Sequence, residues 1–67
     1  MITVTLNGKS REIRALQTIP MVLDSLNING VQVAVAINGL VVSRESWLRT
    51  VVADGDTVEI VRAVGGG

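Results

Sequence analysis

The first residues of the sequence predict a β-hairpin. Residues 2–6 alternate apolar and polar, the period of two expected of a strand with one face on a core. Asn7-Gly8 follows, and this dipeptide is typical of a two-residue hairpin turn because both residues tolerate positive φ. A second strand is expected roughly over residues 10–14, with Ile13 turned inward and its charged positions on an exposed edge.

A helix is predicted after this hairpin. Within residues 18–26 the apolar positions recur at i, i+3, i+4 and i+7, which places them on one face of an α-helix. Thr18 suits the N-cap, and Pro20 falls in the first turn, where an N–H has no helical partner. Residues 27–30 contain two Asn and a Gly, which tolerate the left-handed conformation that ends many helices.

The most apolar run, residues 33–37, predicts a buried strand. Its Val and Ile residues share one face, while Ala34 and Ala36 give the other face a shallow apolar surface. Asn38-Gly39 predicts a second hairpin turn into residues 40–42.

The last third of the chain carries a weaker pattern. Residues 43–49 lose the period of two, and we expect an irregular connection that carries Trp47. A short strand is expected over 50–53, then a tight turn at 54–56 and a final strand over 57–62.

This order of elements predicts an α+β fold, a mixed sheet of four to five strands with one α-helix packed on one face. We expect one domain over residues 1–64, followed by a glycine tail over residues 65–67. A chain of 67 residues buries too little surface for a deep enclosed active site.

Composition excludes several classes of function. Six basic and six acidic residues give no net charge, which argues against a nucleic-acid binder. The absence of His and Cys removes the usual zinc and iron ligands and thiolate chemistry. No apolar run reaches the roughly 18 residues of a membrane span, and no export signal is present, so we expect a cytoplasmic protein without a membrane partner.

The candidate chemistry lies in the three glycines 65–67. They are thin and conformationally free, so they could thread a narrow cleft and deliver a terminal carboxylate to a partner's reaction centre. A carboxylate must gain a leaving group before it reacts, so the expected step is adenylation by a partner using ATP. The alternative interpretation is a frayed end or a remnant of expression.

Several segments occur in one register along the chain and carry a family resemblance. They are Asn7-Gly8, the Thr-capped helix, residues 35–39, Arg44, Trp47, residues 54–61 and the final Gly66-Gly67. Together they resemble the thiamine-biosynthesis sulfur carrier family, ThiS, whose members have the β-grasp (ubiquitin-like) fold. The resemblance covers essentially the whole chain, although Ser43 and Pro20 depart from the family pattern.

The resemblance implies a chemical role for the tail. A ThiF-type adenylyltransferase would activate Gly67 with ATP, a sulfur-donor system would convert the adenylate to a thiocarboxylate, and a ThiG-type thiazole synthase would receive the sulfur. Gly66 would be the second residue of the diglycine and Gly65 a spacer. The chain itself would bind no cofactor and would not be an enzyme.

Repeated, reversible docking requires a modest interface, which we expect on the outer face of the sheet. The candidate residues are Ala34, Ala36, Val41 and Val61. The alternative is that they are ordinary apolar surface residues.

Three further features have both a functional and a structural interpretation. Trp47 is either a partner anchor or a lid over the core, and we favour the lid. Arg44 either contacts an acidic partner or forms a solvated pair with Glu45, and we favour the pair. Asp54 and Asp56 resemble paired carboxylates, but a tight turn explains them better.

Other functions remain open on the sequence. The small subunit of molybdopterin synthase shares the fold and the thiocarboxylate chemistry. A ubiquitin-like modifier would use the same tail to form isopeptide bonds. A β-grasp interaction module would not need the tail.

Overall fold

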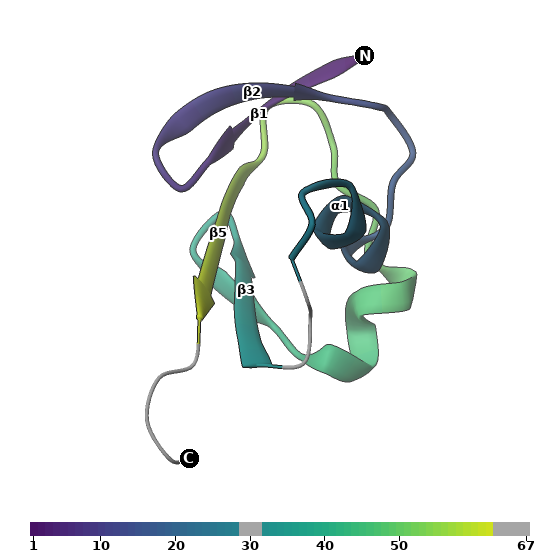
Figure 1. Ribbon diagram of the computed structural model, residues 1–67, viewed down its shortest axis with the longest axis vertical. Helices are drawn as coiled ribbons and strands as arrows, with labels where there is room; N and C mark the ends of the chain where they lie inside the picture. The colour runs from purple at the N-terminus through teal and green to yellow at the C-terminus, as the bar shows by residue number, and fades with distance from the viewer. Residues whose placement is uncertain (29–31, 63–67) are drawn as a thin grey trace.

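The computed structural model describes residues 1–28 and 32–62 and shows a five-stranded mixed sheet with a helix on one face (Figure 1). The elements are β1 (Ile2–Leu6), β2 (Lys9–Ile13), α1 (Ile19–Ser25), β3 (Val33–Ile37), β4 (Leu40–Val42), the 3-10 helix η2 (Arg44–Arg49) and β5 (Thr57–Arg62). In space the strands follow the order β2-β1-β5-β3-β4. The predicted α+β architecture is therefore confirmed.

The last strand, β5, occupies the centre of the sheet. It runs parallel to β1, with Thr5 opposite Thr57 and Leu6 opposite Val58. On its other side it runs antiparallel to β3 along its length, as far as the pair of Val33 and Arg62. β5 therefore has a strand on each side where it begins, whereas only β3 pairs with its backbone as far as Arg62.

Both Asn-Gly pairs form the predicted hairpin turns. Asn7 and Asn38 have φ of 49° and 53°, and the glycines that follow them have φ of 85° and 84°. Two successive residues at positive φ match the right-handed twist of the paired strands. Asn and Gly are the residues that adopt this conformation at the lowest cost.

The core lies between the sheet and α1. The most deeply buried residues are Val4, Ile13, Ile19, Val22, Leu23, Val33, Val35, Trp47, Val52 and Val58. The Val and Ile residues of the strands supply the sheet side of this core, and the apolar face of α1 supplies the other. The predicted inward faces of the strands and of the helix are confirmed.

The predicted helix ends are confirmed where the structure describes them. Thr18 is the N-cap; its carbonyl accepts from the N–H of Val22, whereas its side chain makes no capping hydrogen bond. Pro20 lies in the first turn. Asn27, with φ of 58°, follows the C-cap. The expected contribution of Asn29-Gly30 lies outside the described residues.

Two expectations for the last third of the chain were wrong. Residues 44–49 form η2 rather than an irregular connection, because a helical turn directs one residue, Trp47, into the core and leaves most of the others exposed. The stretch 50–53 is no strand: it makes a single bridge, between Val51 and Thr18. Pairing goes no further because the partner is a loop, in which Gln17 accepts the N–H of Val52.

Candidate functional site

The four residues expected to dock a partner lie together on the face of the sheet opposite α1. Strand register places Val61 beside Ala34 and Ala36 beside Val41. The two valines are 62% and 77% exposed, large fractions for apolar side chains in a sheet. We call these four residues the outer apolar patch.

The remainder of this face is polar. Thr3 and Thr5 of β1 pair with Glu12 and Ser10 of β2, and Glu59 of β5 lies beside the outer apolar patch. Within the residues that the structure describes, the apolar surface of this face therefore lies on β3, β4 and the last part of β5. Such a patch with a polar border is typical of a protein-binding surface.

The outer apolar patch also lies next to the C-terminal end of β5. Val61 belongs to the patch, and Arg62 is the last residue of the strand. Gly65, Gly66 and Gly67, the residues expected to carry the chemistry, lie outside the described residues. A partner bound at the patch would thus contact the strand from which the chain continues to its glycines.

The side chain of Asn7 makes contacts that the sequence analysis did not anticipate. Its Oδ1 accepts the N–H of Ile60 at 2.8 Å, and its Nδ2 donates to the carbonyl of Ile60 at 3.1 Å. Its own N–H donates to the carbonyl of Val58 at 2.9 Å. The first hairpin turn is therefore hydrogen-bonded to the last strand.

Asn38 of the second hairpin has a related arrangement at the other end of β5. Its Oδ1 accepts the N–H of Thr57 at 2.9 Å, and its own N–H donates to the carbonyl of Thr57 at 2.8 Å. Its Nδ2 donates to Asp56 at 3.0 Å. The Asn-Gly pattern predicts the turns, but no local signal marks these contacts, because each joins residues far apart in the sequence.

Trp47 is a lid over the core. It is 6% exposed, and its Nε1 donates to the carbonyl of Val42 at 3.0 Å. The guanidinium of Arg44 lies over the indole, 4.8 Å from the ring centroid, and donates to the carbonyl of Val33 at 3.4 Å. Arg44 therefore packs against the fold, a contact that the expected solvated pair with Glu45 did not include.

Of the two aspartates in the 54–56 turn, Asp56 stabilises the turn itself and Asp54 joins the turn to β1. Asp54 Oδ1 accepts the N–H of Thr3 at 2.8 Å, and Asp56 Oδ2 accepts the N–H of Ala53 at 2.8 Å. Gly55 has φ of 85°, which suits glycine. The structural interpretation of these carboxylates is confirmed.

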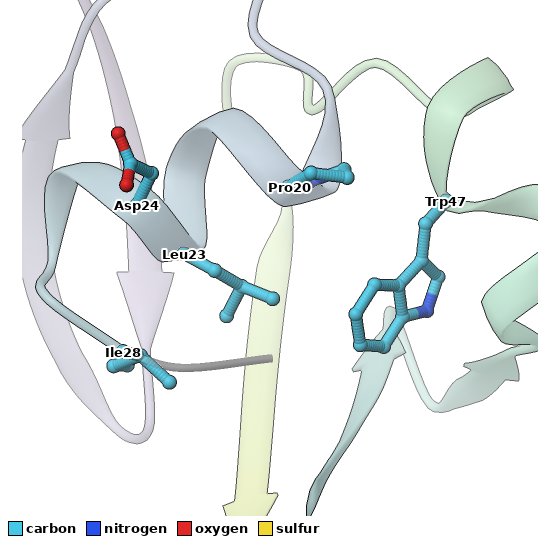
Figure 2. Close-up of a pocket in the computed structure, with 5 residues that line it drawn as sticks. All are labelled: Pro20, Leu23, Asp24, Ile28 and Trp47. Atoms are coloured by element: carbon cyan, nitrogen blue, oxygen red, sulfur yellow. The ribbon is translucent and has the colours of Figure 1, made fainter. Parts of the chain in front are cut away.

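A hollow of about 200 Å³ lies between α1 and η2, on the helix side of the sheet (Figure 2). Its lining consists of Pro20, Leu23, Asp24, Ile28 and Trp47. One carboxylate with an apolar lining supplies no nucleophile and base in contact, and the volume is below the range of most ligand pockets. Among the residues that line this hollow there is no candidate catalytic pair.

The described parts of the chain also show no group of His, Cys, Asp or Glu side chains that could hold a metal ion. Among the same residues, none of the helices is long and apolar enough to cross a membrane.

The order and direction of the strands define a class of protein. Parallel β1 and β5 at the centre, with α1 crossing between β2 and β3, form the β-grasp arrangement. Its candidate functional features are a sheet face and the end of a central strand. The model of the ThiS family matches residues 4–67, and the chain belongs to this family of sulfur carrier proteins of thiamine biosynthesis.

Curated relatives agree with this assignment. The sulfur carrier protein ThiS of Escherichia coli is 31% identical over 64 residues, which cover 96% of this chain and 97% of that protein. A thiazole synthase of Paramagnetospirillum magneticum is 36% identical over 64 residues, again 96% of this chain. The chain spans 20% of the length of that synthase.

Solved structures agree as well. The crystal structure of the thiamine biosynthesis protein ThiS from Geobacter metallireducens has a TM-score of 0.87 and 33% identity, covering 98% of this chain and all of that chain. The solution structure of the thiamine biosynthesis protein from the same organism has a TM-score of 0.77 at the same identity.

Proposed function

We propose that this protein carries sulfur as a thiocarboxylate on Gly67 and delivers it for thiazole formation. The observation that supports this most strongly is the match to the ThiS family through residue 67, on a fold whose central strand leads to the terminal glycines. In this proposal the protein is a co-substrate on which partner enzymes act, which agrees with the name of its relative, the sulfur carrier protein ThiS of Escherichia coli.

The proposed chemistry begins with activation by a partner. An oxygen of the Gly67 carboxylate attacks the α-phosphorus of ATP, and pyrophosphate leaves, giving a mixed anhydride with AMP. A sulfur nucleophile supplied by a donor system then attacks the carbonyl carbon. AMP departs as the leaving group, so a donor persulfide is left joined to Gly67 through an acyl disulfide. A second thiol of the donor system then attacks the donor-side sulfur, which forms a new disulfide and releases the thiocarboxylate. Each catalytic group in these steps belongs to a ThiF-type adenylyltransferase or to the donor system.

A thiazole synthase is the proposed acceptor of the sulfur. The support comes from the relative named thiazole synthase, in which a segment similar to this chain is part of a longer protein. Physical linkage raises the effective concentration of one partner near the other, which is useful where two proteins act in sequence. We infer that this chain contacts a thiazole synthase in the way that the similar segment contacts the rest of that longer protein.

The outer apolar patch is the proposed docking surface. Its four residues are small or β-branched, so they lose little side-chain entropy when a partner covers them. Their position next to the end of β5 allows a partner to hold the sheet and receive the glycines at the same time. A patch of four small side chains fits transient rather than obligate association.

The test is intact-mass measurement of the protein after incubation with a ThiF-type adenylyltransferase, ATP and a sulfur donor. The expected product has one oxygen replaced by sulfur, and fragmentation places the change at Gly67. A matched sample without ATP should stay unmodified. A sulfur at any other residue, or covalent adducts to other proteins in place of sulfur, would contradict the proposal.

A further inference from the structure

We propose that Asn7 is a positioning residue for the tail: its side-chain amide fixes the end of β5, so that the glycines start from a defined point relative to the outer apolar patch. This inference rests on the proposed function, because it assigns Asn7 a role in presenting Gly67 to the adenylyltransferase.

The geometry shows the Asn7 amide taking the place of main-chain groups. In a parallel ladder, the residue whose N–H binds Val58 would also offer its main-chain carbonyl to the N–H of Ile60. Asn7 makes the first bond, but with φ of 49° the chain turns away toward β2. Its Oδ1 accepts the Ile60 N–H instead, at 2.8 Å, and its Nδ2 donates to the Ile60 carbonyl at 3.1 Å.

One side chain thus satisfies both main-chain groups of Ile60 on the side where β1 has ended. The backbone pairing of β1 with β5 stops at Leu6 and Val58, whereas β3 continues beside β5 as far as Arg62. Without the amide, the part of β5 beyond Val58 would be hydrogen-bonded only to β3 among the described strands. The amide therefore extends the support of β5 on the β1 side from Val58 to Ile60, two residues before the strand ends at Arg62.

Support at this point matters for the reaction because Ile60 immediately precedes Val61 of the outer apolar patch. A partner that binds the patch fixes the sheet, and the direction of β5 then sets where the chain enters the partner. Five residues lead from Arg62 to Gly67, so in extended form they span about 17 Å. A small change in direction at the strand is magnified over that length, and a misplacement of about 1 Å can slow a reaction roughly a hundredfold.

The second hairpin supplies a matched control. Asn38 also precedes a glycine, also has positive φ and also binds a β5 main-chain N–H through Oδ1. It acts at Thr57, where β5 begins, rather than near its end. The variants Asn7→Gly and Asn38→Gly remove the respective amides while keeping a residue that adopts positive φ.

The experiment measures ATP–pyrophosphate exchange by a ThiF-type adenylyltransferase with the unmodified chain and both variants as substrates. Thermal unfolding of each chain is recorded alongside. We expect Asn7→Gly to lower kcat about tenfold through loss of its two hydrogen bonds to Ile60. Its KM should stay within about twofold, because the outer apolar patch is unchanged. Asn38→Gly should leave both constants within about twofold despite a similar loss of thermal stability.

Equal effects of the two variants on kcat would overturn the inference, since they would indicate general destabilisation. A rise in KM with unchanged kcat in Asn7→Gly would also overturn it. If Asn7→Gly does not fold, Asn7→Asp replaces it. In that variant one carboxylate oxygen still accepts the Ile60 N–H, but the second oxygen faces the Ile60 carbonyl and cannot donate to it. Its kcat should also be lower than that of the unmodified chain.

Amide hydrogen exchange of the free chain separates this inference from the proposed function. Asn7→Gly should accelerate exchange of the Ile60 amide at least about tenfold more than Asn38→Gly does, because Oδ1 of Asn7 binds that N–H. No acceleration would overturn the positioning role. Failure of the unmodified chain to be adenylated, with this acceleration present, would count against the proposed function instead.

Discussion

Trp47 shows how a single residue in this small protein is committed to the fold. Its ring is 6% exposed, it donates to the carbonyl of Val42, and Arg44 covers its outer surface. A domain of this size obtains roughly 3–5 kcal/mol from its core, so one large side chain is a substantial part of the total. A residue used in this way is poorly placed to bind a partner.

We therefore expect Trp47→Ala to unfold the protein, because truncation of a buried Trp costs about 3–5 kcal/mol. Trp47→Phe should fold with a free energy of unfolding lowered by about 1–2 kcal/mol, through the lost hydrogen bond and volume. Urea unfolding followed by circular dichroism measures both. Leu48→Ala is the matched control at the next position, 76% exposed, and should change stability by less than about 0.5 kcal/mol. A Trp47→Phe variant with unchanged stability but impaired adenylation would show that the indole contacts a partner.

At the scale of the element, β4 offers two exposed apolar side chains on opposite faces. Val41 belongs to the outer apolar patch and is 77% exposed. Leu40, on the same strand, is 74% exposed, but it pairs with Ile37 and lies on the other face. Substituting each residue in turn therefore shows whether partner binding depends on the outer apolar patch or on any exposed apolar side chain of β4.

We expect Val41→Ser to raise the KM for the adenylyltransferase about fivefold to tenfold, because it removes apolar area buried in the complex. Leu40→Ser should leave KM within about twofold. Unfolding should differ little between the two variants, since both side chains are exposed in the free protein. An equal rise of KM in both, or an effect of Leu40→Ser only, would place the docking surface elsewhere.

Elements with a regular local pattern could be predicted from the sequence. The period of two identified β1, β3 and β5, and the Asn-Gly pairs identified both hairpins, because these signals act between near neighbours. In contrast, η2 contains one buried apolar residue, Trp47. A single buried position cannot show the repeating pattern from which a helix is predicted. The expected strand over 50–53 failed because its partner, Thr18, lies in a loop that no alternation reveals.

The same reasoning applies to the candidate site. The four residues of the outer apolar patch could be chosen from alternation, but their adjacency depends on register between β3, β4 and β5. The contact of Asn7 with Ile60 joins residues that are 53 positions apart in the sequence. The same Asn7 is also explained by the hairpin turn in which it lies. Because the turn alone accounts for Asn7, the sequence gives no sign that its side chain also binds a distant strand.

At the scale of the whole molecule, folding and chemistry are separated along the chain. The sheet, the helix and the buried residues named above lie within residues 2–62, whereas the proposed chemistry lies at residue 67. We expect deletion of Gly66 and Gly67 to leave the free energy of unfolding within about 0.5 kcal/mol of the unmodified protein. The same deletion should abolish adenylation. Loss of folding on deletion would show that the glycines are part of the core structure.

The central claim is that other enzymes act on the free carboxylate of Gly67. The most direct test appends one alanine after Gly67 and measures ATP–pyrophosphate exchange with a ThiF-type adenylyltransferase, next to the unextended chain. The fold should be unaffected by one residue at this end, so unfolding of the two chains serves as the control. We predict exchange with the unextended chain and none with the extended one. Full exchange with the extended chain, as an untrimmed protein of confirmed mass, would contradict the account.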